Sequence, residues 1–354
     1  MRLPAIFSLL SLLIVAPLVA AQAREKYQST IDKGNAWLAK QQHRDGHWGG
    51  RNDRDAILLT SLAGLVFIEE GSTPTNNGKY AGNLDKAVDW MLTRCQPDGR
   101  IGTPPKAGET ADGLRDHAFA LRFLARICGE VARPAKRQAI RNAITKAVNF
   151  AAQQQSPQGG WSHRKDRADL DVTTAMLYGL GETRNAGIPV PKAIWLKAKE
   201  CVRNATMPNG GVAPRINAAG KPRGTSSAVC TSAALAGLYE GDFRDAHSIR
   251  WLKFCQRAVT APTRADDPWL HYYYAQTRYR LDENVFARVF LNAAPAECLT
   301  WSSYRRQQFD RLQKTQKADG SWPGVDRRHG PIFTMALNLS IMQLDTGLFS
   351  LMPR

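Results

Sequence analysis

The sequence predicts an all-α protein that folds as an α/α toroid, an α6/α6 barrel of six helical hairpin repeats. A segment built around a glycine occurs five times along the chain, and three of the five copies also contain a tryptophan. Its central glycines stand at positions 46, 99, 159, 210 and 320, so the steps between them are 53, 60, 51 and 110 residues. The last step is about two of the others, which indicates one degenerate copy in a repeat array. Between these segments, helices with one apolar face alternate with helices that are apolar on all sides.

The first element is a leader. Met1-Arg2 precede an apolar run from Leu9 to Ala20, and Ala21-Gln22-Ala23 has the small-residue pattern of a cleavage site. The apolar run is shorter than the roughly 20 residues that cross a membrane. We therefore expect a secretory signal peptide over residues 1–23 and one toroid domain over residues 24–354. The protein would be exported, periplasmic or extracellular, with no transmembrane segment after cleavage.

The mature chain is strongly basic. Without the leader it carries 47 Lys and Arg against 31 Asp and Glu, a formal charge of +16. This favours an acidic partner such as an acidic glycan, whereas nucleic acid is not expected, because the protein is exported and its basic residues are scattered. The six cysteines permit disulfides in an oxidising compartment, but a chain of this size does not require them.

The first helix of each repeat should be half-buried. Between residues 84 and 95, and again between 144 and 151, apolar residues recur with the i, i+3, i+4, i+7 spacing of a one-sided helix. These first helices are predicted to begin near Tyr27, Leu84, Ile140, Lys192, Ser248 and Tyr304.

The second helix of each repeat should be fully buried. Residues 56–66, 172–180 and 229–238 are apolar nearly all round and rich in alanine and glycine. These helices are predicted to begin near Asp53, Leu114, Asp169, Thr225, Trp269 and Pro331. Six half-buried and six buried helices fit two concentric rings.

The glycine segment should form the turn between the two helices. Glycine supplies the left-handed residue that ends a helix, and tryptophan packs back across the base of the hairpin. The glutamine that precedes the turn is expected to bond the last carbonyls of the first helix.

Gln-x-x-x-Gly-x-Trp at helix ends, in repeats of this length, resembles the prenyltransferase and squalene-cyclase repeat superfamily. The resemblance covers the mature chain and is nearest to exported bacterial terpene-cyclase-like proteins. It rests on Asp116-His117-Ala-Phe-Ala120, Asp169-Leu-Asp171-Val-Thr173-Thr, Ala186-Gly-Ile-Pro-Val-Pro191 and Tyr272-Tyr-Tyr274-Ala. The resemblance implies an α/α toroid that binds a hydrophobic small molecule or lipid, isoprenoid-like in character, in its central cavity.

Candidate ligand-binding residues lie where the second helices begin. The positive N-terminal ends of these helices should face a common mouth of the ring and favour anions there. Polar or aromatic residues at this end are Asp55, Asp116, His117, Asp169, Asp171, Thr173, Thr225, Cys230, Asp267, His271, Tyr272, His329 and Thr334. We take Asp55, Thr173, His271, Tyr272 and His329 as the ligand-binding candidates. The Tyr272-Tyr-Tyr274 run with Trp269 would line an apolar or carbohydrate-binding cavity, or else belong to the core.

Candidate catalytic residues are Asp171, Asp169 and His117. The resemblance implies that an Asp-x-Asp-Asp motif would protonate an alkene, and Asp169-Leu-Asp171-Val172 keeps two of its three acids. The alternative is that an aspartate caps the helix with support from Thr173. His117 could serve in acid–base chemistry, or could be a hydrogen-bonded structural histidine.

No cofactor is expected, although a zinc site remains open. The resemblance implies zinc bound by Asp, Cys and His, and Cys230 with His271 could supply two ligands, completed by Asp171 or His117. Alternatively, Cys230 fills the core and His271 hydrogen-bonds within the tyrosine cluster.

Several functions remain open at this point. The first is an exported toroid that binds an apolar ligand without catalysis. The second is an enzyme of the terpene-cyclase or prenyltransferase type, a transferase or an isomerase. The others are a secreted lyase or hydrolase of acidic polysaccharides, which would use a carboxylate pair, and a protein-binding module.

Overall fold

The protein is described by a computed structural model that covers residues 26–49, 55–102, 113–238, 246–260, 267–281, 300–324 and 329–346. The predicted signal peptide, residues 1–23, lies outside the described residues. Among the described helices, none is long and apolar enough to cross a membrane.

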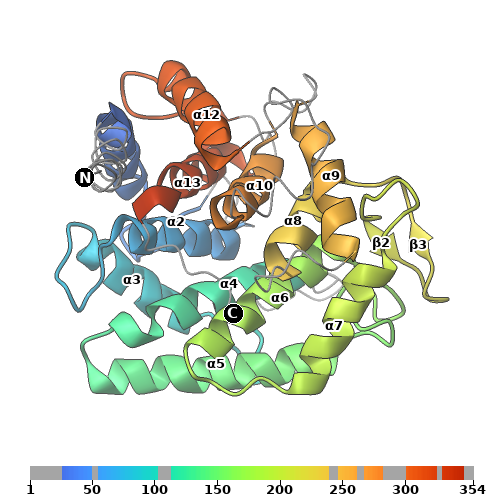
Figure 1. The fold of residues 1–354 in the computed structure, drawn as a ribbon. Coiled ribbons are helices and arrows are strands. Elements are labelled where there is room, and N and C mark those ends of the chain that lie inside the picture. The colour runs from blue at the N-terminus through green and yellow to red at the C-terminus, as the bar shows by residue number, and fades with distance from the viewer. Residues whose placement is uncertain are drawn as a thin grey trace, which may run out of the picture.

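Six helices form a closed inner ring, as predicted. They are α2 (Ala56–Glu70), α4 (Leu114–Ile127), α6 (Leu170–Asn185), α8 (Ala228–Leu238), α10 (Pro268–Arg280) and α13 (Gly330–Met342). Each packs against the next in this order, and α13 packs against α2 to close the ring (Figure 1). Every residue of α2 except Glu70 is buried, which confirms for this helix the prediction that it is covered on all sides.

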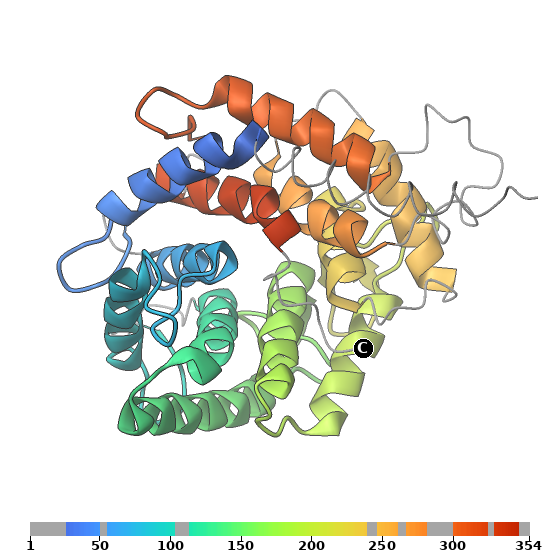
Figure 2. The ribbon, with the colours of Figure 1, turned by 60° about the vertical axis from the view of Figure 1, so that its left-hand side comes forward.

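Six further helices surround the inner ring (Figure 2). They are a helix over residues 26–40, α3 (Ala81–Leu92), α5 (Pro134–Gln154), α7 (Lys192–Asn204), α9 (Ala246–Thr260) and α12 (Trp301–Thr315). Two short 3-10 helices also occur, η1 (Cys128–Glu130) and η4 (Leu344–Thr346). The predicted α/α toroid of six helical hairpins is therefore confirmed in the described part of the chain.

A three-stranded sheet was not predicted. Strands β1 (Ala168–Asp169), β2 (Arg215–Ile216) and β3 (Pro222–Arg223) pair antiparallel in the order β1-β2-β3. Each strand has only two residues, so no alternating pattern long enough to indicate a strand exists in the sequence.

The repeated glycines join one repeat to the next. Gly46 has a φ of +104°, and a Cβ placed on it would lie 2.4 Å from the carbonyl oxygen of Lys86 in α3. Only glycine fits a left-handed turn pressed so closely against a backbone. Gly320 makes the same contact with Lys33 of the first helix, at 2.5 Å, so the last repeat closes on the first.

The repeated tryptophans and glutamines have different roles. Indole nitrogens donate to carbonyls near the end of the preceding outer helix: Trp48 to Leu38 at 2.7 Å, Trp161 to Ala151 at 2.8 Å and Trp322 to Leu312 at 2.7 Å. The glutamines, which we had expected to bond those carbonyls, instead donate to the outer helix of the next repeat. The bonds are Gln42 to Asn83, Gln155 to Ile194 and Gln316 to Thr30. For these three glutamines that expectation was wrong: each amide also donates to the carbonyl of its own turn glycine, and so ties the turn to the next repeat.

The cysteines that the structure describes are unpaired. Cys95, Cys128, Cys201, Cys230 and Cys255 are free thiols, whereas Cys298 lies outside the described residues. Helix packing holds this part of the chain together without a disulfide.

Candidate functional site

Asp55, Arg115 and His329 meet at the mouth of the inner ring. They stand at or beside the first residues of α2, α4 and α13, which are neighbours in the ring. His329 Nδ1 lies 3.0 Å from Asp55 Oδ2, and His329 Nε2 lies 3.4 Å from a guanidinium nitrogen of Arg115. The side chain of His329 is 3% exposed and that of Asp55 is 20% exposed. Two of the predicted ligand-binding residues, Asp55 and His329, are thus brought together where the ring closes.

Aromatic side chains lie next to this polar group. The rings of His329 and Phe333 are 4.9 Å apart, and Trp269 lies 5.0 Å from Phe333 and 5.7 Å from Phe119. Phe119 is on α4 and Trp269 is on α10, so this contact joins opposite helices of the ring. Trp269 also stacks on Tyr273, at 5.5 Å and 10°. Trp269 is only partly buried, whereas Phe119, Phe333 and Tyr273 are buried. We call these four residues the aromatic floor.

A buried charge network lies farther into the ring. Arg122 donates to the Tyr272 hydroxyl at 2.7 Å, lies 3.9 Å from a carboxylate oxygen of Glu182 and stacks over Tyr178 at 4.9 Å. Burial raises the pKa of Glu69 to about 7, partly opposed by the charge of Arg122. Tyr272, a predicted ligand-binding residue, is 1% exposed and belongs to this interior network.

The two candidate catalytic aspartates differ in their surroundings. The Asp169 carboxylate accepts a 2.5 Å hydrogen bond from Ser162 Oγ and lies 4.0 Å from Arg167 Nε. Asp169 occupies the N-cap position of α6 and Thr173 Oγ1 donates to its carbonyl at 2.8 Å, as the capping alternative held, but the Asp169 carboxylate itself makes no capping bond. Asp171 is exposed in the first turn of α6.

His117 and Thr173 occupy equivalent positions in two repeats. Thr173 Oγ1 accepts from the backbone N–H of Trp161 at 3.0 Å, and His117 Nδ1 accepts from that of Ile101 at 3.0 Å. Thr60 and Thr231 bond their own turns in the same way. His117 is fully buried, and burial lowers its pKa to about 4. Both side chains hold a turn onto an inner helix, so His117 matches the alternative of a hydrogen-bonded structural histidine.

The predicted zinc ligands have other contacts. His271 Nδ1 lies 2.8 Å from the hydroxyl of Tyr304, so the imidazole faces the outer helix α12. Cys230 is buried near Asp169 and Asp171, and burial raises the pKa of its thiol to about 11. Within the described ranges, no three His, Cys, Asp or Glu side chains are placed to hold a metal ion.

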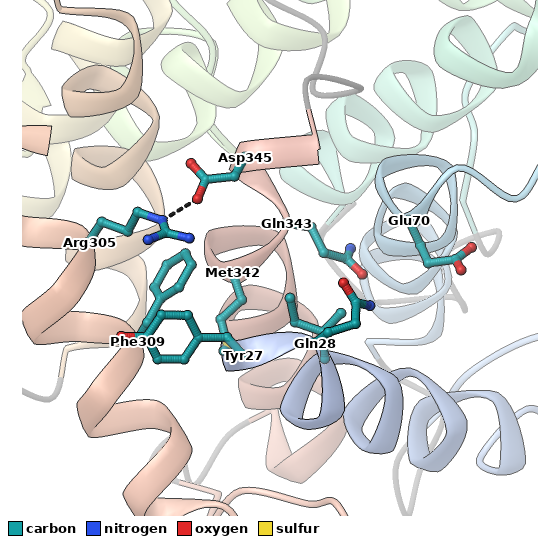
Figure 3. Close-up of a pocket in the computed structure, with 9 residues that line it drawn as sticks. Tyr27, Gln28, Glu70, Arg305, Phe309, Met342, Gln343 and Asp345 are labelled. Atoms are coloured by element: carbon teal, nitrogen blue, oxygen red, sulfur yellow. Dashed lines mark hydrogen bonds and ion pairs between the residues drawn. The ribbon is translucent and has the colours of Figure 1, made fainter. Parts of the chain in front are cut away.

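A small cavity lies at the other end of α2. Its volume is about 220 Å³, and it is bounded by the end of α13 and by the starts of α12 and the first helix (Figure 3). Arg305 pairs with Asp345 along one side, and Glu70 stands on the other. The cavity is therefore separated from the mouth by the length of an inner helix.

Comparison with known proteins gives the fold. No protein-family model matches the chain, and no curated protein matches it. A single-residue variant of the type II terpene cyclase MstE from Scytonema aligns over 92% of this chain and 99% of its own, with a TM-score of 0.61 and 14% identity. The chain has the α/α toroid fold of that protein. The GH76A alpha-1,6-mannanase from Salegentibacter sp. HEL1_6 aligns over 91% of this chain and 99% of its own, with a TM-score of 0.62 and 9% identity.

The toroid is thus shared by proteins that act on unlike molecules. A variant of MstE is solved with geranylgeranyl dihydroxybenzoate as its substrate, at a TM-score of 0.58, 12% identity and coverage of 92% of this chain and 99% of its own. The mannanase acts on a glycan. The fold alone therefore does not indicate the function of this chain.

Proposed function

We propose that this toroid binds an apolar, isoprenoid-like molecule at the mouth of its inner ring, outside the cytoplasm. The aromatic floor carries the proposal, because Trp269 presents a partly open aromatic face above buried aromatic neighbours. Pockets for small molecules are mostly apolar and have a few polar groups that fix orientation. Asp55, Arg115 and His329 supply such polar groups at the edge of the floor.

The proposal assigns binding rather than cyclisation. A cyclase-type acid must donate its proton to an apolar substrate. Asp169 instead accepts a hydrogen bond from Ser162, Asp171 is open to solvent, and Val172 stands in the third position of the motif. The MstE complex with an isoprenoid substrate supports the ligand class, since it shows that this fold can hold such a chain.

The test is binding of geranylgeraniol, followed by tryptophan fluorescence or native mass spectrometry. Replacing Trp269 by leucine should weaken binding by about ten-fold, which corresponds to roughly 1.4 kcal/mol. Trp37→Leu is the matched control, because Trp37 lies on the outer helix over residues 26–40 and should leave the affinity unchanged. Equal affinity of wild type and Trp269→Leu for geranylgeraniol would contradict a binding site on the aromatic floor.

A glycan hydrolase is the second candidate. The alignment with the mannanase favours it, as does the presence of Asp169 and Asp171 at the start of one inner helix. Glycoside hydrolysis commonly uses two carboxyl groups, one as acid and one as base or nucleophile. Release of reducing ends from alpha-1,6-mannan, abolished by Asp171→Asn, would favour this function over ligand binding, and intact mannan after prolonged incubation would exclude that substrate.

A further inference from the structure

The small sheet has one buried and one exposed face. Ala168 pairs with Ile216, which pairs with Pro222, and Ala168 and Ile216 are buried. On the other face, Asp169 pairs with Arg215, which pairs with Arg223. Two arginines therefore stand directly opposite each other on adjacent strands.

This exposed face has an excess of positive charge. Arg215 and Arg223 are exposed, and neither lies within ion-pair distance of an acidic side chain in the described part of the protein. The neighbouring Arg167 approaches Asp169, whose carboxylate is already bonded by Ser162. Arg167 thus has a carboxylate nearby, whereas Arg215 and Arg223 have none within ion-pair distance in the described part of the protein. Like charges directly opposite in a sheet repel, so the arrangement stores repulsion that an anion would relieve.

The hairpin that carries the arginines is held in place at both ends. At its tip, the Gln158 side chain donates to the Ala218 carbonyl at 2.8 Å. The side-chain oxygen of Asn217 accepts from the Lys221 N–H at 2.9 Å and so closes the turn. At its base, Leu170 N–H donates to the Pro214 carbonyl at 2.9 Å. The register of Arg215 and Arg223 is therefore fixed before any ligand binds, which lowers the entropy lost on binding.

The sheet adjoins the mouth, because β1 leads directly into α6 at Leu170. We propose that Arg167, Arg215 and Arg223 form an anion site that binds the acidic group of the mouth ligand, a carboxylate, sulfate or phosphate. This inference rests on the proposed function for the apolar part of that ligand. Guanidinium groups suit the task, because they form bidentate hydrogen bonds with planar and tetrahedral anions.

The experiment compares geranylgeranoic acid with geranylgeraniol, which differ in the acidic group. Wild type should bind the acid about ten-fold more tightly than the alcohol, the effect expected of one charge-assisted bidentate contact. In Arg215→Gln/Arg223→Gln the two ligands should bind equally, at the affinity of the alcohol. Lys33→Gln/Lys146→Gln lowers the net charge by the same amount at exposed positions of other helices, and should keep the preference for the acid.

A second measurement separates this inference from the proposed function. The melting temperature is recorded in sodium sulfate and in sodium chloride at equal ionic strength. Sulfate should raise it more in wild type and in Lys33→Gln/Lys146→Gln than in the arginine variant. If neither isoprenoid binds but this sulfate difference is present, the proposed function fails and the anion site stands. An unchanged acid preference, or an equal sulfate response in all three proteins, would overturn the anion site.

Discussion

Arg122 and Tyr272 join opposite sides of the inner ring through a hydrogen bond of 2.7 Å between the guanidinium and the phenol hydroxyl. The bond joins α4 to α10, the same two helices that the contact between Phe119 and Trp269 joins. Side chains therefore meet across the ring. The interior holds buried charge, and buried charge makes stability depend on pH.

Glu69 should make the protein less stable as the pH rises through neutrality. Burial raises its pKa in the folded state to about 7, from 4.5 in an unfolded chain. Between these values the folded state holds the proton more tightly, so the free energy of unfolding falls with rising pH and levels off above about pH 7. Glu69→Gln should remove this fall, and its free energy of unfolding should exceed that of wild type by about 3 kcal/mol at about pH 8.

Urea denaturation at about pH 5, 6, 7 and 8 measures this dependence. Glu70→Gln is the matched control, because Glu70 is the next residue of α2 and is only partly buried. In Glu70→Gln the free energy of unfolding should depend on pH as steeply as in wild type. If the free energy of unfolding of Glu69→Gln fell with pH as steeply as that of wild type, the Glu69 carboxyl would be ionised in the folded protein at every pH measured.

The hairpins could be predicted from the sequence because their turns depend on local chemistry. Gly46 adopts the left-handed conformation in the turn that follows the helix over residues 26–40, and Trp161 bonds a carbonyl only ten residues earlier in the chain. The predicted starts of the helices lie within three residues of those observed except for α5, which was predicted near Ile140 and begins at Pro134. The apolar periodicity of a helix follows from its burial.

The candidate site was less predictable, because its contacts depend on tertiary structure. Asp55 and His329 were both expected at the mouth, but their pairing requires the ring to close. The contact of Trp269 with Phe119 joins opposite helices, which no periodicity indicates. The sequence allowed a structural role for His117 but not its equivalence to Thr173, because His117 lies farther from its turn glycine than Thr173 does, so the two positions do not align by spacing.

His117 should make the protein sensitive to acid. Burial lowers its pKa to about 4, from 6.5 when unfolded, so the unfolded state binds the proton more tightly between these values. The contribution of His117 to the free energy of unfolding is therefore complete above about pH 6.5. It is lost as the pH falls toward 4, by about 3 kcal/mol for this one residue. Thr60, Thr173 and Thr231 accept the same turn bond without titrating.

His117→Thr should therefore retain the hairpin and abolish this loss. Its free energy of unfolding, measured in urea at about pH 4, 5, 6 and 7, should fall less steeply than that of wild type. Because other titrating groups contribute equally to both proteins, the difference between the two slopes isolates His117. His43→Gln is the control, since His43 is exposed and should leave the slope unchanged. Parallel curves for wild type and His117→Thr would contradict the assignment.

Gly320 should be the least replaceable of the glycines at the ring seam. Its φ is +91°, and a Cβ would lie 2.5 Å from the Lys33 carbonyl oxygen, which belongs to the first helix. Gly320→Ala must therefore adopt a left-handed backbone and also push the last repeat away from the first, at a total cost above roughly 3 kcal/mol. Gly187→Ala separates the two effects, because Gly187 has a φ of +68° but nothing within 4 Å of a Cβ. It should cost only about 1 kcal/mol. Comparing both variants with wild type by urea denaturation tests the seam: equal losses would mean that the backbone angle alone matters and that the contact between Gly320 and Lys33 does not hold the ring closed.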